Sequence, residues 1–198
     1  MPSIREVEHY LTGLWLLLRN NPKGLTYLDL SDRGVLRSFW AIVWSGPSIL
    51  ISWIWWRKTY LSAMPVGADA GPLFYFRLAM IEAANWIVPL ILVGLLCLTL
   101  RLGTKFAVIV VASNWLAVPV SYVYAVLIVV MMLVPPLANV VALLWFVVLL
   151  VVVNAVFRIV RTICGDQLLT VGALTMVLLV PAMVFSEVLE RFLGVFPN

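Results

Sequence analysis

No charged residue occurs between Lys105 and Arg158, an interval of about fifty positions. A membrane-spanning helix needs about twenty apolar residues, so this interval is long enough for two spans. The rest of the chain has a similar character, with 64% hydrophobic residues, 11% charged residues and a mean hydropathy of +1.10. Soluble domains contain about 45–50% apolar and about 25% charged residues. The sequence therefore indicates an integral membrane protein.

The N-terminal part, residues 1–34, differs from the rest of the chain. In residues 3–19, apolar residues recur every three or four positions, and Ser3 and Glu6 have the spacing of a capping box, which predicts an amphipathic helix. This helix is too short and too charged to span the bilayer. We expect it to lie at the membrane interface, with Tyr10 and Trp15 near the headgroups, and to be followed by a cytoplasmic connector.

The remaining residues, 35–198, contain apolar segments that we expect to form a five-helix transmembrane domain. The segments cover residues 35–56, 73–100, 106–133, 137–157 and 168–186. Pro135-Pro136 separates the third segment from the fourth, because a double proline removes two backbone donors and favours a turn. The sequence thus predicts an all-α, polytopic integral membrane protein with about five transmembrane helices and an N-terminal interfacial helix.

The distribution of Lys and Arg favours one orientation of these spans. With the N-terminus in the cytoplasm, nine basic residues lie on the cytoplasmic side: Arg5, Arg19, Lys23, Arg33, Arg37, Arg101, Lys105, Arg158 and Arg161. Four lie on the other side: Arg57, Lys58, Arg77 and Arg191. Cytoplasmic loops carry the excess of basic residues. Residues 1–10 do not have the pattern of a cleavable signal peptide, so we expect the mature chain to start near Met1. The distribution of basic residues favours a cytoplasmic N-terminus and a C-terminus on the opposite side, and the location that we expect is a bacterial inner membrane.

Two stretches are nearly the same: AANWIVP at residues 83–89 and ASNWLAVP at residues 112–119. Each places an asparagine, Asn85 or Asn114, shortly before a proline within a span. At about 1.5 Å per residue, four prolines lie at similar depths and are expected to kink their helices: Pro47, Pro89, Pro119 and Pro181. The asparagines are donors near the carbonyls that these prolines free. They fit either interhelical hydrogen bonding or a polar path between the second and third spans.

The stretch FRLAMIEAANW places Glu82 within the second predicted span. Glu82, Asn85 and Pro89 are spaced i, i+3 and i+7, so they form one stripe on a helix. An ionisable group inside a span is by default a functional-site hypothesis. In the alternative interpretation, the helix enters the membrane near Leu78, and Glu82 lies at the interface with Arg77 as its partner.

Several classes of chemistry lack their characteristic residues. His9 is the only histidine and lies outside the predicted spans, so an intramembrane haem or histidine-ligated metal has no ligands there. No phosphate-binding glycine loop, metal-spaced cysteine pair or His-containing triad is present, so we expect no enzyme, no cofactor and no metal. The basic residues flank apolar segments and form no patch. Nucleic acid is therefore not an expected partner.

The remaining polar groups have structural interpretations. Asp29 and Asp32 could be read as a carboxylate pair, but they fit a loop and a helix start, with Ser31 or Asp32 as the N-cap. Cys97 falls within a span and Cys164 in a short cytoplasmic loop, so both are expected to be free thiols.

The general layout of the chain resembles the Yip (Ypt-interacting protein) family and its bacterial relatives. The resemblance rests on the amphipathic start, on LLLRNNPKGLTYLDLSDRGVLRSFWAIVW before and into the first span, on five clustered spans and on NWLAVP in the third. It implies a five-helix membrane protein associated with membrane organisation or trafficking in eukaryotic members. The extended cytoplasmic domain of those members is missing, and no catalytic residues carry over.

Two function classes fit these observations. The first is a small non-enzymatic accessory or membrane-organising subunit, whose partners are the lipid bilayer and other membrane proteins in a larger complex. The alternative is a small-solute transporter or channel with a polar path along the second and third spans. The candidate residues of that path are Glu82, Asn85, Asn114, Ser121 and Tyr124, with Arg77 at its outer rim.

Overall fold

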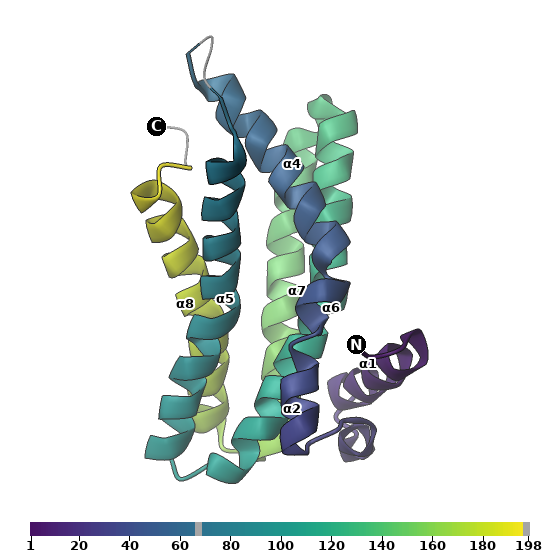
Figure 1. Cartoon of the computed structure of the whole chain (residues 1–198). Coiled ribbons are helices and arrows are strands. Elements are labelled where there is room, and N and C mark those ends of the chain that lie inside the picture. Colours follow the sequence, from purple (N-terminus) through teal and green to yellow (C-terminus); the bar gives the residue numbers. More distant parts are fainter. Residues whose placement is uncertain (66–68, 196–198) are drawn as a thin grey trace.

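Every regular element of the computed structural model, which describes residues 1–65 and 69–195, is a helix (Figure 1). The α-helices are α1 (Ile4–Leu18), α2 (Asp32–Ser38), α3 (Ala41–Trp44), α4 (Gly46–Ala63), α5 (Pro72–Thr99), α6 (Gly103–Leu133), α7 (Ala138–Cys164) and α8 (Leu168–Phe192). Two 3-10 helices, η1 (Pro22–Tyr27) and η2 (Pro135–Leu137), connect them. The predicted all-α class is confirmed.

Four helices are long and apolar enough to cross a membrane: α5, α6, η2 with α7, and α8. The segment Asp32–Trp44 and α4 pass the same test together, with a bend of 44° between them, and make up to a fifth span. The prediction of about five spans is therefore confirmed. The first span differs from the continuous helix expected over residues 35–56, because it is broken.

The break in the first span lies at Ser45, the residue that ends α3 and precedes α4. Pro47 lies in the first turn of α4, where its missing N–H has no intrahelical acceptor to lose, so proline favours a new helix start there. The other three prolines behave differently. Pro89, Pro119 and Pro181 lie inside α5, α6 and α8, and each of these helices continues through its proline.

The long helices form two neighbouring groups. Helices α5 and α8 share the most extensive contact, while α6 packs against α4 and α7 (Figure 1). Contacts between α7 and α8 and between α5 and α6 join the groups. Most buried apolar residues lie in a cluster that α1 shares with α5, α6, α7 and α8. A smaller cluster packs the Pro72 end of α5 against α4 and α8, around Phe74, Leu78 and Ile81.

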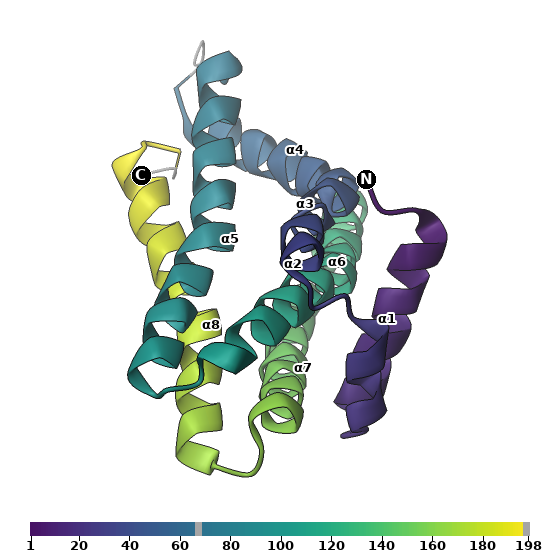
Figure 2. The same ribbon diagram turned by 60° about the horizontal axis from the view of Figure 1, so that its bottom comes forward.

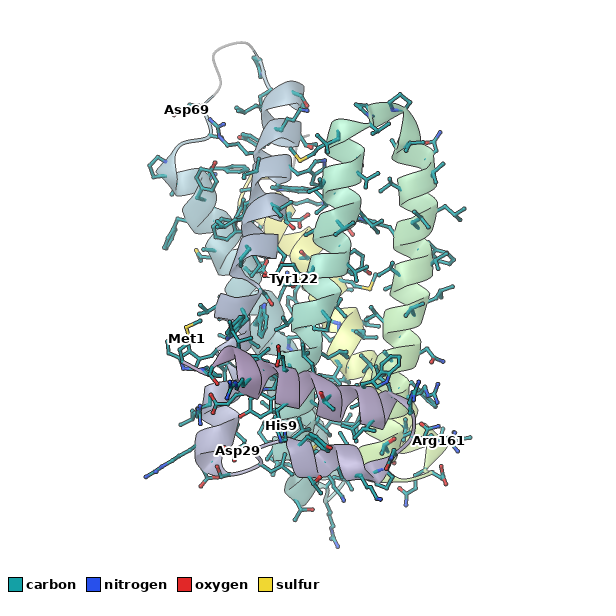
Figure 3. The ribbon with its side chains drawn as sticks, turned by 90° about the vertical axis from the view of Figure 1, so that its right-hand side faces the viewer. Met1, His9, Asp29, Asp69, Tyr122 and Arg161 are labelled. Atoms are coloured by element: carbon teal, nitrogen blue, oxygen red, sulfur yellow. The ribbon has the colours of Figure 1, made fainter. Side chains whose placement is uncertain are left out.

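Helix α1 lies across the long helices and not along them (Figure 3). It lies on the far side of α6 and α7 from α5 and α8, as Figure 2 shows. The predicted capping box is confirmed, because the Ser3 N–H donates to Glu6 Oε2 at 2.7 Å and the Glu6 N–H donates to Ser3 Oγ at 3.3 Å. Of the two predicted N-cap candidates of α2, Ser31 or Asp32, the N-cap is Ser31, which accepts from the Gly34 N–H.

The expected headgroup position of Tyr10 is wrong. Tyr10 is only 6% exposed, and its ring stacks on Trp115 of α6 with a centroid distance of 4.7 Å. Trp15 remains exposed, and the Arg19 guanidinium lies 4.9 Å from its ring centroid. Helix α1 therefore packs on the bundle through Tyr10 and leaves Trp15 exposed at the surface of the protein. Cys97 and Cys164 are both free thiols, as predicted.

Candidate functional site

Two cavities between the long helices share two lining residues, Glu82 and Asn85, and this shared wall is called the junction here. The first, about 410 Å³, is called the aromatic cavity here, and is lined by Ser52, Trp53, Trp55, Trp56, Leu78, Ile81, Glu82, Asn85, Tyr124, Ile128, Trp145, Ser186 and Glu190. The second, about 240 Å³, is called the aliphatic cavity, and is lined by Glu82, Asn85, Trp86, Pro89, Leu90, Ser113, Asn114, Leu116, Ala117, Val120, Val152, Val156, Leu178 and Leu179.

A chain of hydrogen bonds crosses from α5 to α8 at the aromatic cavity. Asn85 Nδ2 donates to Ser186 Oγ at 3.3 Å, and Ser186 Oγ donates to Glu190 Oε1 at 3.0 Å. Ser186 and Glu190 are four residues apart, which places them on one face of α8. Asn85 Oδ1 is buried and has no hydrogen-bond partner among the described residues. This oxygen is an acceptor that is available to a donor or a cation.

Glu82 adds a carboxylate at the junction of the two cavities. It is half-buried, and the Trp86 indole, one turn further along α5, hydrogen-bonds to its carboxyl group. The described residues form ion pairs between Arg37 and Glu6, Arg161 and Asp166, and Arg191 and Glu187; Glu82 and Glu190 belong to none of them. No Lys, Arg or His is among the described residues that line either cavity.

The expected pairing of Arg77 with Glu82 is wrong. The Arg77 guanidinium lies beside Gly194, just past the end of α8, where a Cβ added to the glycine would be 3.8 Å from Arg77 Nη1. The C-terminal end of a helix attracts cations, because its last carbonyls carry partial negative charge. Arg77 therefore lies near the end of α8 and lines neither cavity.

The structure separates the other residues of the predicted polar path. Tyr124 lines the aromatic cavity, and Asn114 lines the aliphatic cavity. Ser121 lines neither: its hydroxyl accepts from Ser48 Oγ at 2.8 Å and donates to the Val118 carbonyl at 2.8 Å. Ser121 therefore joins α6 to α4. The residues of the path predicted along the second and third spans are thus divided between two cavities that share Glu82 and Asn85, and Ser121 lies outside both.

The expected role of the asparagines as donors to proline-freed carbonyls is also wrong. The Asn114 side chain, only 3% exposed, donates from Nδ2 to Ser38 Oγ at 2.8 Å. Each asparagine thus donates to a serine on another helix, Asn85 to α8 and Asn114 to α2. These are interhelical contacts of the kind that polar residues form in membranes.

Sequence reasoning missed part of the site. Ser186 and Glu190 are not among the predicted site residues. Glu190 lies beyond the last predicted apolar segment, which ends at residue 186, whereas α8 continues to Phe192. The i, i+4 spacing of these two residues was the available signal. The aromatic residues Trp53, Trp55, Trp56 and Trp145 were missed because tryptophan is common at membrane interfaces. Nothing in a single segment indicated that they face one cavity.

Within residues 1–65 and 69–195, no group of three or more His, Cys, Asp or Glu side chains could hold a metal ion. Comparison of the chain with family models, with curated proteins and with solved structures gave no match. The resemblance to the Yip family therefore stays a prediction. Fold and composition define the class: the chain is a polytopic integral membrane protein.

Proposed function

We propose that this protein is a non-enzymatic small-solute transporter or channel whose solute binds where the two cavities meet. The observation that carries the proposal is that Glu82 and Asn85 line both an aromatic cavity of about 410 Å³ and an aliphatic cavity of about 240 Å³. Both residues lie well inside α5, a helix long enough to span the bilayer. This geometry favours the transporter reading of the sequence over the accessory reading.

The surplus of acceptors at this junction supports the proposal. The carboxylates of Glu82 and Glu190 and the unpartnered Asn85 Oδ1 face a region without basic side chains among the described linings. A charged side chain inside a bilayer costs about 3 kcal/mol or more, and such residues mark substrate or ion pathways. If these helices served packing alone, we would expect basic partners for the carboxylates, or apolar residues in their place. A bound solute provides the missing partner.

The prolines of the surrounding helices support a site that can change conformation. Pro89 lines the aliphatic cavity, and Pro119 and Pro181 lie inside α6 and α8. A proline removes one intrahelical hydrogen bond, so a helix bends there at lower cost than elsewhere. Bending of α5 and α8 relative to α6 and α7 would open the junction at Glu82 and Asn85 from one cavity toward the other.

For the orientation we propose a cytoplasmic N-terminus and an outer C-terminus in a bacterial inner membrane. The nine-to-four distribution of Lys and Arg supports it. Reporter fusions after Gly103 and after Asn198 test it: the first is expected to be active in the cytoplasm and the second on the opposite side. Reversed activities would contradict this orientation.

Solute flux into proteoliposomes tests the proposed function. Three labelled probes cover three charge classes: tetraphenylphosphonium, glycerol and benzoate. We expect protein-dependent flux of at least one probe, and a loss of about tenfold or more in Glu82→Gln, because the carboxylate lies at the junction. Glu187→Gln is the matched control on α8, since Glu187 is exposed and pairs with Arg191. Absence of protein-dependent flux for all three probes would contradict the proposal.

A second candidate function, a subunit of a larger membrane complex, is favoured by Asn154. This amide is exposed in the middle of α7 and has no hydrogen-bond partner among the described residues. Only 11% of the most apolar window of this span is buried. Amides in spans form hydrogen bonds between helices, so Asn154 suits a partner helix. The test is the size of the particle in mild detergent: Asn154→Leu is expected to dissociate a larger assembly, and an unchanged particle would contradict this role.

A further inference from the structure

We propose that the aromatic cavity binds an organic cation, a hydrophobic body that carries one positive charge. The inference rests on the proposed function, because it names the solute class of the same site. It is carried by the joint presence of five aromatic side chains, two carboxylates and an unpartnered amide oxygen around one cavity.

The aromatic walls come from three helices. Trp53, Trp55 and Trp56 line the cavity from α4, and Tyr124 and Trp145 line it from α6 and α7. The Trp55 and Trp56 rings lie 5.5 Å apart, and the Tyr124 and Trp145 rings meet edge to face at 5.6 Å. The face of an aromatic ring attracts a cation, and tryptophan does so most strongly. Aromatic rings on several sides are the arrangement that recognises quaternary ammonium groups.

The charged groups of the cavity select the sign of the ligand. Glu82 comes from α5 and Glu190 from α8, and the lining contains no Lys, Arg or His among the described residues. An anion would meet two carboxylates without a counterion. A neutral solute would leave both carboxylates with hydrogen bonds but without a counterion in a low-dielectric region, where an uncompensated charge is unfavourable. A cation satisfies them and also contacts the Asn85 Oδ1 acceptor.

The chemistry of the lining distinguishes an organic cation from a metal ion. Hard cations such as Mg²⁺ and Ca²⁺ need about six or more oxygen ligands at close range. The described residues contain no group of three His, Cys, Asp or Glu that could hold a metal. The apolar and aromatic walls offer no replacement for a tightly held hydration shell. A volume of about 410 Å³ lies within the range of small-molecule sites.

Binding of tetraphenylphosphonium to the purified full chain in maltoside detergent tests the inference by calorimetry. Tetraphenylborate, which has the same shape and the opposite charge, is the matched probe. We expect saturable binding of the cation, and an affinity at least about tenfold lower for the anion. Glu82→Gln and Trp145→Leu are expected to weaken cation binding by about tenfold or more, because each removes one element of the recognition.

Two control variants keep the test specific. Glu187→Gln removes an exposed carboxylate of α8, and Trp15→Leu removes an exposed indole of α1; neither residue lines the cavity. Both should bind the cation as the wild type does. Helical circular dichroism and the melting temperature establish that all four variants fold. Equal affinity for the two probes, or unchanged cation affinity in folded Glu82→Gln, would overturn the inference.

Further arms identify the source of the cation and separate this inference from the proposed function. Competition by phosphatidylcholine, whose headgroup is a quaternary ammonium, assigns the site to a lipid headgroup; competition by choline alone assigns it to a free solute. Cation binding without flux of any probe would overturn the transport function and leave this inference standing. Flux of glycerol or benzoate without cation binding would overturn this inference and leave the transport function standing.

Discussion

The two Asn-Trp stretches of this chain have nearly the same sequence and different surroundings. Asn114 and Trp115 on α6 are 3% and 1% exposed; the asparagine donates to Ser38, and the tryptophan stacks on Tyr10 of α1. Asn85 and Trp86 on α5 are half-buried and line cavities, and Asn85 Oδ1 has no partner among the described residues. One stretch is a packing site and the other is a candidate binding site.

The difference comes from the neighbours of each helix. Helix α6 contacts α1, α2, α3, α4, α5 and α7, so its asparagine is almost fully buried and bonded to α2, although it also lines the aliphatic cavity. Helix α5 packs chiefly on α8, and together these two helices border both cavities. The same residue types therefore stabilise the bundle at one position and leave polar atoms available to a solute at the other.

The largest effect is expected for Asn85→Leu. Loss of the amide removes the free Oδ1 acceptor and the contact with Ser186, so uptake of tetraphenylphosphonium into proteoliposomes should fall by about tenfold or more, while the melting temperature changes little. Asn139→Leu is the matched control, since Asn139 is exposed at the start of α7 and lines neither cavity. Unchanged uptake in a folded Asn85→Leu protein would contradict the proposed role of Asn85 in solute binding.

The second prediction concerns Asn114→Ala, which should act mainly on stability. The substitution removes the buried hydrogen bond to Ser38 and leaves a small cavity, so the free energy of unfolding in detergent should fall by about 1–2 kcal/mol. The double variant with Ser38→Ala should lose less than the sum of the single variants, because the two side chains form one contact. Additive losses would show that the hydrogen bond contributes nothing.

A smaller loss is expected at the contact between α4 and α6. Ser48 Oγ lies 2.8 Å from Ser121 Oγ, and the single Ser48 hydroxyl proton is shared between Ser121 Oγ and the Ser45 carbonyl, while the Ser121 hydroxyl donates to the Val118 carbonyl. Ser121→Ala should therefore lower the free energy of unfolding by only about 0.6 kcal/mol, the average for polar contacts between helices in membranes. Uptake of the cation should not change, because Ser121 lines neither cavity. Loss of uptake at unchanged stability would contradict this assignment and indicate that Ser121 is part of the solute path.

The smallest effect is expected for α1, which packs against Trp115 of α6. The backbone N–H of Ser3, and then Arg37, lower the pKa of Glu6 below its ordinary value of 4.5. The ionised form thus stabilises the folded state above about pH 4.5, and this contribution is lost as the pH falls through the lowered pKa. Amide exchange in α1 should increase at acid pH in the wild type. In Glu6→Gln the increase should be absent; an equal increase there would contradict this assignment.

Some of this structure follows directly from local sequence. The charge-free interval after Lys105 and the double proline at Pro135 give α6 and α7, because the bilayer requires continuous apolar helices. The Ser3–Glu6 spacing gives the start of α1, and Pro47 the start of α4. These features depend on residues a few positions apart. A single sequence contains the information that fixes them.

The candidate site can be predicted from the sequence only in part, because it depends on which helices become neighbours. Glu82 and Asn85 are conspicuous in an apolar span, so sequence analysis finds them. Glu190 is adjacent to Arg191 near the chain end and reads as a loop residue until α8 is placed beside α5. Spacing alone predicts Arg77 as the partner of Glu82, yet the Arg77 guanidinium lies beside Gly194 at the end of α8. Distances between helices decided both outcomes.

Cysteine accessibility at Asn85 tests directly whether this stretch of α5 faces a cavity that solutes enter. In a chain with Cys97→Ala and Cys164→Ala, single cysteines replace Asn85 or Ile87; Ile87 is exposed on α5 and lines neither cavity. Each protein, in proteoliposomes, is treated with the membrane-impermeant cationic reagent trimethylammonioethyl methanethiosulfonate and with its anionic sulfonate counterpart. We predict that Asn85→Cys reacts with the cationic reagent at least about tenfold faster than Ile87→Cys, and faster than with the anionic one, because a thiolate reacts only where water and the reagent enter. Equal, slow labelling of the two cysteines would show that Asn85 is as inaccessible as a lipid-facing residue and would contradict the account.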